Sequence, residues 1–147
     1  MIVLLGIATQ LMRMVLGFPI GAAAAVAFAA SLLIAFALNF LIFWCVGMLA
    51  FWLSEIGFLF EAMRIVIITA SGGVFPLAVF GPAGEAILKT LPFRFTIQFP
   101  TELLCGRLPA SEIASSFALS LAWIALLALL AGALWKAGVR RFAAVGS

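Results

Sequence analysis

The sequence predicts an all-α integral membrane protein with four membrane helices and a re-entrant helical hairpin before the last of them. The chain of 147 residues is 67% hydrophobic and only 9% charged, whereas about a quarter of the residues in a soluble domain are charged. Long apolar runs are separated by short polar breaks. One further apolar stretch, residues 71–106, is interrupted by regularly placed prolines and glycines. We therefore treat residues 1–147 as a single transmembrane domain.

The side chains available argue against several classes of protein. The sequence has no His and no Asp, and its net charge of +3 is spread thinly along the chain. Nucleic-acid binding needs clustered Lys and Arg, so no nucleic-acid partner is expected. The usual metal-binding, acid–base and phosphate-binding motifs are also missing. We expect no catalytic residue, no cofactor and no metal in this chain.

Residues 1–18 predict the remains of a truncated membrane span. The segment is apolar but contains Gln10 and Arg13. In a signal peptide the basic residue precedes the apolar stretch, so this segment fits that class poorly. Pro19 marks its end, because proline disfavours helix in the residue before it.

Residues 20–53 contain no charged residue and predict a long membrane span. One continuous helix of this length would measure about 50 Å, against a hydrocarbon core of about 30 Å. The segment is therefore either one long tilted helix or two minimal spans that turn near Asn39. The single helix is favoured, because residues 22–46 contain no Gly or Pro that would signal a turn.

Residues 56–75 predict the next span, after a polar break at Ser54 and Glu55. Glu61 and Arg64 are three residues apart, so they are neighbours on one helix face. Charges inside a span are costly and usually face protein or water. These two lie near the start of the span and could also reach the membrane interface by snorkelling. A juxtamembrane ion pair and a role in coupling or in the transport path both remain open.

Residues 76–107 predict the re-entrant hairpin. Prolines divide it into arms of about ten residues, whereas a crossing helix needs about 20. The arms are nevertheless too apolar for an open loop, and backbone at membrane depth must be hydrogen-bonded within the protein. A helical hairpin that enters one leaflet meets both constraints. The alternative is an amphipathic segment that lies flat on the membrane.

Residues 114–136 predict the last span, and residues 137–147 predict a cytoplasmic tail. Lys136, Arg140 and Arg141 follow the end of this span directly, with no acidic residue nearby. Basic residues at span ends favour the cytoplasmic side. The hairpin also carries three basic residues, but acidic residues accompany them.

Several landmarks occur in a fixed order along the chain. They are AFW before a polar break, SGGVFPL, LPF, FP followed by E and GRL, and RRFAAVG in the tail. Their order and spacing resemble the carboxy-terminal half of type-2 ABC exporter permeases, in particular the bacterial six-span permease subgroup. The resemblance covers residues 22–146. It implies that the predicted spans are the third to sixth of a six-helix permease, with the hairpin on the extracellular side.

The resemblance also implies a function. The chain would be a membrane-spanning subunit of an ATP-driven exporter, a multi-pass protein of the bacterial cytoplasmic (inner) membrane. A second permease copy or a paired permease would complete the path through the lipid bilayer, and separate ABC ATPase subunits would hydrolyse ATP. The alternative function is a small multi-pass membrane protein with an assembly or regulatory role and no transport of its own.

Three groups of candidate functional residues follow from these interpretations. Hairpin or gate candidates are Pro76, Pro82, Pro92, Phe93, Pro100 and Gly106. Candidates for coupling to the ATPase are Ser54, Glu55, Glu61 and Arg64. Candidates for lining the path are Asn39 and Thr69.

Overall fold

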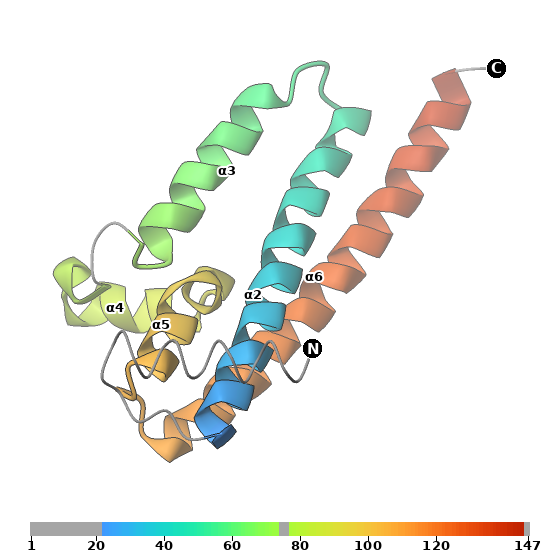
Figure 1. Cartoon of the computed structure of the whole chain (residues 1–147). Helices are drawn as coiled ribbons and strands as arrows, with labels where there is room; N and C mark the ends of the chain where they lie inside the picture. The colour runs from blue at the N-terminus through green and yellow to red at the C-terminus, as the bar shows by residue number, and fades with distance from the viewer. Residues whose placement is uncertain (1–21, 74–76, 146–147) are drawn as a thin grey trace.

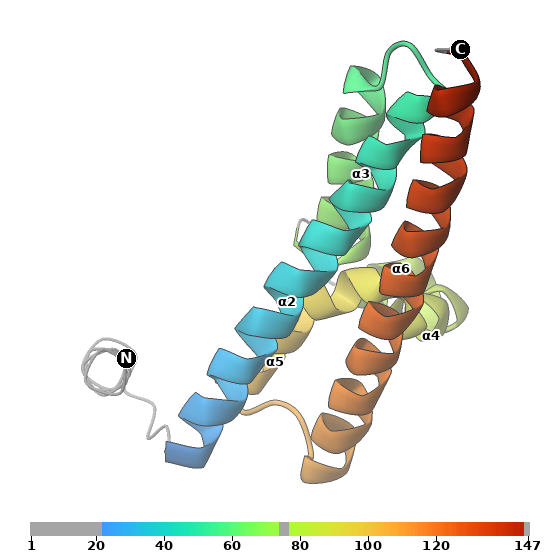
Figure 2. The same cartoon turned by 90° about the vertical axis from the view of Figure 1, so that its right-hand side faces the viewer.

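The computed structural model describes residues 22–73 and 77–145, and every regular element in this part of the chain is a helix. Three helices run lengthwise, and short helices pack against them at one end (Figures 1 and 2). The all-helical prediction is confirmed for these residues. The truncated span at residues 1–18 and the gate candidate Pro76 lie outside the described residues.

Helix α2 (Ala22–Met48) is the long helix predicted for the second apolar run, and the 3-10 turn η1 (Leu49–Phe51) follows it. The helix passes Asn39 without a break. The Asn39 side-chain nitrogen donates a 3.0 Å hydrogen bond to the Ala35 carbonyl one turn earlier, so this amide is satisfied within its own helix. The structure therefore favours one long helix over two spans that turn at Asn39.

Helix α6 (Ala110–Val145) packs along α2 and is the longest element, with 36 residues. Within residues 22–73 and 77–145, two helical segments are long and apolar enough to cross a membrane, namely Ala24–Phe51 and Ala110–Arg141. The predicted last span, residues 114–136, lies wholly inside α6. The helix also continues through most of the predicted tail, where Lys and Arg are good helix formers.

Helix α3 (Gly57–Ala70) is shorter than the span predicted for residues 56–75. Its 14 residues measure about 21 Å, less than the hydrocarbon core of about 30 Å. The helix stops because Gly72 has a φ of 78°, the left-handed conformation that glycine adopts at helix ends. Whether α3 crosses the membrane stays a prediction.

The predicted hairpin is built from four short helical elements. They are η2 (Leu77–Phe80), α4 (Gly81–Thr90), η3 (Pro92–Thr96) and α5 (Gln98–Leu104). Pro82 lies in the first turn of α4 and Pro92 begins η3, positions where the missing N–H costs no helical hydrogen bond. We call α4 the outer arm, and η3 with α5 the inner arm. Neither arm is long enough to cross a membrane.

The inner arm supplies three of the five residues of the buried core cluster in the described structure. Phe95 and Phe99 have no exposed surface, and their rings meet edge to face at 5.8 Å. Phe99 also meets the ring of Phe117 on α6 at 5.2 Å. The buried core cluster is Ile34, Leu38, Phe95, Phe99 and Leu103. The inner arm is therefore packed between α2 and α6 rather than attached at their edge.

The two ends of the molecule differ in what they carry. The connection between α2 and α3 and the C-terminal end of α6 lie together at one end (Figure 1), where the rings of Phe51 and Trp135 meet at 5.9 Å. The hairpin packs on the other half of α2 and α6. Ser54 and Glu55 are thus at the same end as the basic residues of α6.

Candidate functional site

The candidate site is the contact surface between the inner arm and helices α2 and α3. Both arms of the hairpin are attached to the long helices. The aromatic core of the inner arm packs on α2 and α6, and the outer arm is fixed to α6 by a hydrogen bond. There the Trp123 indole N–H donates to the Thr90 carbonyl at 2.8 Å. This bond joins residues 33 positions apart and closes the hairpin against the long helix.

A buried ion pair lies inside the inner arm. Arg94 Nη2 is 2.9 Å from Glu102 Oε2, and the two side chains are only 8% and 22% exposed. Gln98 Nε2 donates to the other carboxylate oxygen, Glu102 Oε1, at 2.6 Å. The carboxylate therefore accepts one bond on each oxygen. We call these three residues, Arg94, Gln98 and Glu102, the polar cluster.

The polar cluster leaves two buried atoms unsatisfied. Within the described part of the chain, Arg94 Nε and Gln98 Oε1 have no hydrogen-bond partner and almost no exposed surface. Leaving a buried polar group unpaired costs about 1–3 kcal/mol. The cluster is thus an energetically costly feature of a mostly apolar element, because two of its buried polar atoms lack a hydrogen-bond partner in the described structure.

A small cavity of about 190 Å³ lies beside this cluster, between α2, α3 and the inner arm. It brings together Asn39 and Arg64, which the sequence placed in two separate groups of candidates. The hairpin contributes Thr96, which is buried and donates a 2.6 Å hydrogen bond to the Phe93 carbonyl. The lining residues are Asn39, Phe43, Arg64, Ile67, Ile68, Thr96 and Ile97.

The predicted ion pair of α3 is present but exposed. Arg64 Nη1 lies 3.7 Å from Glu61 Oε2, and the two side chains are 65% and 69% exposed. Exposed pairs of this kind contribute only about 0–1 kcal/mol. Glu61 and Arg64 are therefore neighbours on one helix face, as predicted, and the charge of Arg64 stands at the edge of the small cavity.

Comparison with known protein families identifies the family to which this chain belongs. The chain matches the family described as ABC-2 family transporter protein over residues 1–146. The chain belongs to the ABC-2 transporter permease family. Members of this family are typically non-catalytic transmembrane subunits, which agrees with the expected lack of enzymatic activity. No curated protein and no solved structure matches the chain.

The remaining gate candidates of this ABC-2 permease fall into buried and exposed sets. Pro92 and Pro100 are buried in the inner arm, and Phe93 is half-buried. Pro82 and Gly106 are exposed, and Gly106 has a φ of 63°. The buried set belongs to the packed interior of the inner arm, whereas Gly106 lies in the connection between the inner arm and α6.

The other candidates are dispersed. Ser54 and Glu55 are exposed in the connection between α2 and α3, at the end of the permease opposite the hairpin. Thr69 is half-buried, and its carbonyl accepts the Gly72 N–H at 3.4 Å, so it belongs to the end of α3.

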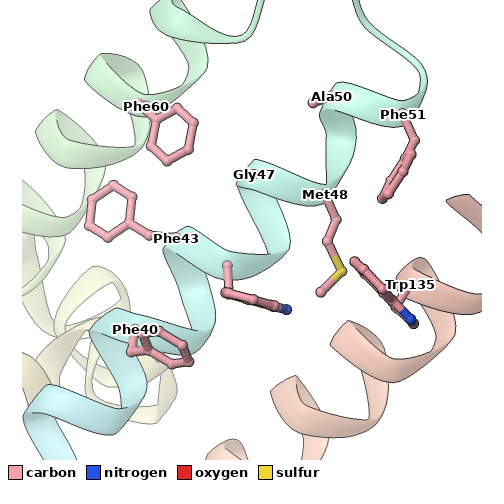
Figure 3. Close-up of a pocket in the computed structure, with 9 residues that line it drawn as sticks. Phe40, Phe43, Gly47, Met48, Ala50, Phe51, Phe60 and Trp135 are labelled. Carbon is pink, nitrogen blue, oxygen red and sulfur yellow. The ribbon is translucent and has the colours of Figure 1, made fainter. Parts of the chain in front are cut away.

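An apolar groove of about 680 Å³ lies on the other half of the permease, over α2 and between α3 and α6 (Figure 3). Phe43 and Phe60 stack across one side at 5.9 Å, and Trp135 faces the groove from α6. The lining residues are Phe40, Phe43, Trp44, Gly47, Met48, Ala50, Phe51, Phe60 and Trp135. None of them is charged, so the groove suits an apolar surface and offers no group for chemistry.

Sequence reasoning missed the polar cluster. In the sequence, Arg94 and Glu102 were among the basic and acidic residues of the hairpin that were compared with the basic tail to predict the orientation of the chain in the membrane. A usable signal was present, because Arg94 lies within the Phe-rich segment between Pro92 and Pro100 and Glu102 follows that segment directly after Thr101. Charges in such an apolar setting are expected to pair with each other.

Proposed function

We propose that this chain is a membrane-spanning permease subunit of an ATP-driven ABC exporter in the bacterial inner membrane. It forms the translocation path with a second permease copy or a paired permease. ATP is bound and hydrolysed by separate ABC ATPase subunits. Membership of the ABC-2 transporter family over residues 1–146 supports this proposal.

In this proposal α2, α3 and α6 are the fourth, fifth and sixth membrane helices of the permease, and residues 1–18 belong to the third. The C-terminal end of α6 faces the cytoplasm, because Lys136, Arg140 and Arg141 are exposed there and basic residues collect on that side. Ser54 and Glu55 then face the cytoplasm as well, within reach of an ATPase. The hairpin opens from the extracellular side and reaches into the bilayer.

The packing of Phe95 and Phe99 is the observation that carries the mechanism. These rings fill the space between α2 and α6, so a change in the spacing of the two helices has to move the inner arm. Packed interfaces switch between discrete arrangements rather than deforming continuously. The inner arm therefore acts as the external gate, and Pro92, Phe93 and Pro100 shape it. Asn39, Arg64 and Thr96 contribute the polar side chains to the lining of the small cavity beside this gate.

An ABC ATPase is sought among the genes beside that of the permease, and the proposal is tested by reconstitution of the permease with it. The two proteins are co-expressed, purified in detergent and placed in liposomes. We expect the ATPase to copurify with the permease and to hydrolyse ATP several-fold faster in the complex than alone. A variant of the ATPase without its phosphate-binding lysine is the control for contaminating hydrolysis.

Two results would contradict the proposal. An ATPase that is not retained by the permease, or whose hydrolysis rate does not respond to it, would favour an assembly or regulatory role. The absence of an ABC ATPase gene beside this one would point the same way.

A further inference from the structure

The inner arm bends sharply between η3 and α5. Ile97, the residue at the bend, has φ −133° and ψ −55°, outside helical geometry. Pro100 helps to explain the bend, because it has no N–H to donate to the Thr96 carbonyl four residues earlier. A continuous helix through residues 92–104 would lack this bond, and the chain changes direction instead.

The polar cluster spans this bend. Arg94 precedes Ile97 and Glu102 follows it, and their 2.9 Å contact joins η3 to α5. Phe95 and Phe99 also meet across the bend. The bend is therefore fixed by an ion pair as well as by an aromatic contact.

The end of α3 lies directly against the cluster. A side chain at Gly72 would come within 3.0 Å of Gln98 Oε1, and one at Gly73 would come within 3.1 Å of Ile97 Cδ1. The two glycines thus let the backbone of the α3 terminus touch the bend. The other end of α3 begins just after Ser54 and Glu55, so one short rigid helix connects the predicted ATPase-facing loop with the polar cluster.

Stability alone gives little reason for an ion pair at this position. Replacing a buried ion pair by well-packed apolar side chains is often neutral or stabilising. Ionisable residues at membrane depth are costly and mark functional positions. The pair also leaves Arg94 Nε and Gln98 Oε1 unsatisfied in the described structure. An element that has to open and close fits these properties better than a purely structural one.

We propose that Arg94, Gln98 and Glu102 form a lock that holds the bent inner arm against the end of α3. Arg94 and Glu102 are positioning residues for the gate, and movement of α3 reaches them through the contact of Gly72 with Gln98. This inference rests on the proposed permease function. It adds to that function the residues that hold the gate closed. It also adds α3 as the helix through which movement at the predicted ATPase-facing loop reaches these residues.

The test measures exposure of the gate with a buried reporter. Cys45 and Cys105 are first replaced by Ser, and Thr96→Cys is introduced as a near-isosteric thiol at a buried position. Labelling by a membrane-impermeant maleimide is followed in liposomes. The lock is removed by Arg94→Met together with Glu102→Leu, which leaves no unpaired charge in the core.

We expect the reporter thiol to react about tenfold faster in the lock-free variant, the factor given by losing one charge-assisted hydrogen bond. ATP hydrolysis by the complex should also lose most of its dependence on the permease. The matched control is Glu85→Leu with Lys89→Met, which removes the half-exposed 2.7 Å ion pair of the outer arm. That control should change neither readout. Thr101→Cys, an exposed position in α5, should label at the same rate in all variants.

Unchanged labelling of Thr96→Cys in the lock-free variant would overturn the proposal. The charge-swapped variant, Arg94→Glu with Glu102→Arg, provides a second test. It should restore slow labelling if pairing is what matters, whereas labelling as fast as in the lock-free variant would contradict the lock. Loss of membrane insertion in both double variants would also contradict it, because the pair would then be needed for folding.

The two proposals fail in different ways. If the wild-type complex does not hydrolyse ATP but lock removal still exposes Thr96→Cys, the permease function fails and the lock stands. If hydrolysis depends on the permease and lock removal leaves both readouts unchanged, the lock alone fails.

Discussion

Gly138 of α6 lies against the ring of Phe51, so closely that a Cβ at position 138 would overlap the ring atoms. This contact brings α6 against η1 at the end of the molecule that carries Ser54 and Glu55. The neighbouring contact of Phe51 with Trp135 extends it along α6. The close approach of α6 to η1 therefore depends on the absence of a side chain at one position.

Gly138→Ala is expected to destabilise the permease by about 1–3 kcal/mol, the usual cost of overpacking. The methyl group would push α6 away from η1. Thermal unfolding in detergent measures the effect. Gly132→Ala is the matched control, because a Cβ at Gly132 meets nothing within 4 Å, and it should be neutral or stabilising. Equal destabilisation by both substitutions would show that the Phe51 contact is not responsible, because Ala is a better helix former than Gly at both positions.

Phe99→Ala is expected to cost about 3–5 kcal/mol of stability, as for other large-to-small core substitutions. Its ring is fully buried among α2, α5 and α6. The control is Phe58→Ala on α3, a side chain that is 66% exposed and should cost much less. Comparable losses at the two positions would mean that the inner arm is not the core of the fold.

Gly106→Leu and Pro92→Leu are expected to impair export-coupled ATP hydrolysis more than membrane insertion. Gly106 has a positive φ, and a side chain there adds about 1–2 kcal/mol of backbone strain. Hydrolysis by the reconstituted complex is compared with the amount of inserted protein. Gly106→Asn, which tolerates this backbone conformation better, should be milder. Equal losses of hydrolysis and insertion would rule out a gating role.

Trp123→Phe should loosen the outer arm by removing the 2.8 Å hydrogen bond to the Thr90 carbonyl. We expect a loss of about 0.5–1.5 kcal/mol, typical of one such bond. Hydrogen exchange of the α4 amides reports local opening and should rise in this variant only. Trp135→Phe keeps the aromatic contact with Phe51 at the other end and should leave α4 exchange unchanged. A similar exchange rate in both variants would contradict the anchoring role.

Local sequence signals predicted the elements of this fold well. The absence of charge in residues 20–53 and of Gly and Pro in residues 22–46 predicted one long helix, and α2 follows that prediction. The prolines predicted short arms, because proline restricts where a helix begins. The span predicted for residues 56–75 was too long at its end, because α3 stops at Ala70 and Gly72 already adopts a positive φ.

The candidate site was harder to predict because it depends on tertiary contacts. Asn39 and Arg64 lie on different helices, and only the packing of α2 on α3 and the inner arm brings them to one cavity. Arg94 and Glu102 are eight residues apart, which is not a helical neighbour spacing. They meet only because the chain bends at Ile97. No periodicity in the sequence encodes such a bend.

In the proposed permease, the unequal apolar lengths of α3 and α6 impose a hydrophobic mismatch on the surrounding lipid. The uncharged run of α6, residues 114–135, extends over about 33 Å, enough for the bilayer core, whereas α3 falls about 9 Å short of it. The apolar helix surface that lipid tails contact is therefore shorter beside α3 than beside α6. Bilayers accommodate such differences by local thinning on one side and by helix tilt on the other. Acyl-chain length should accordingly alter how deeply the hairpin is seated, which makes membrane thickness a variable of this permease.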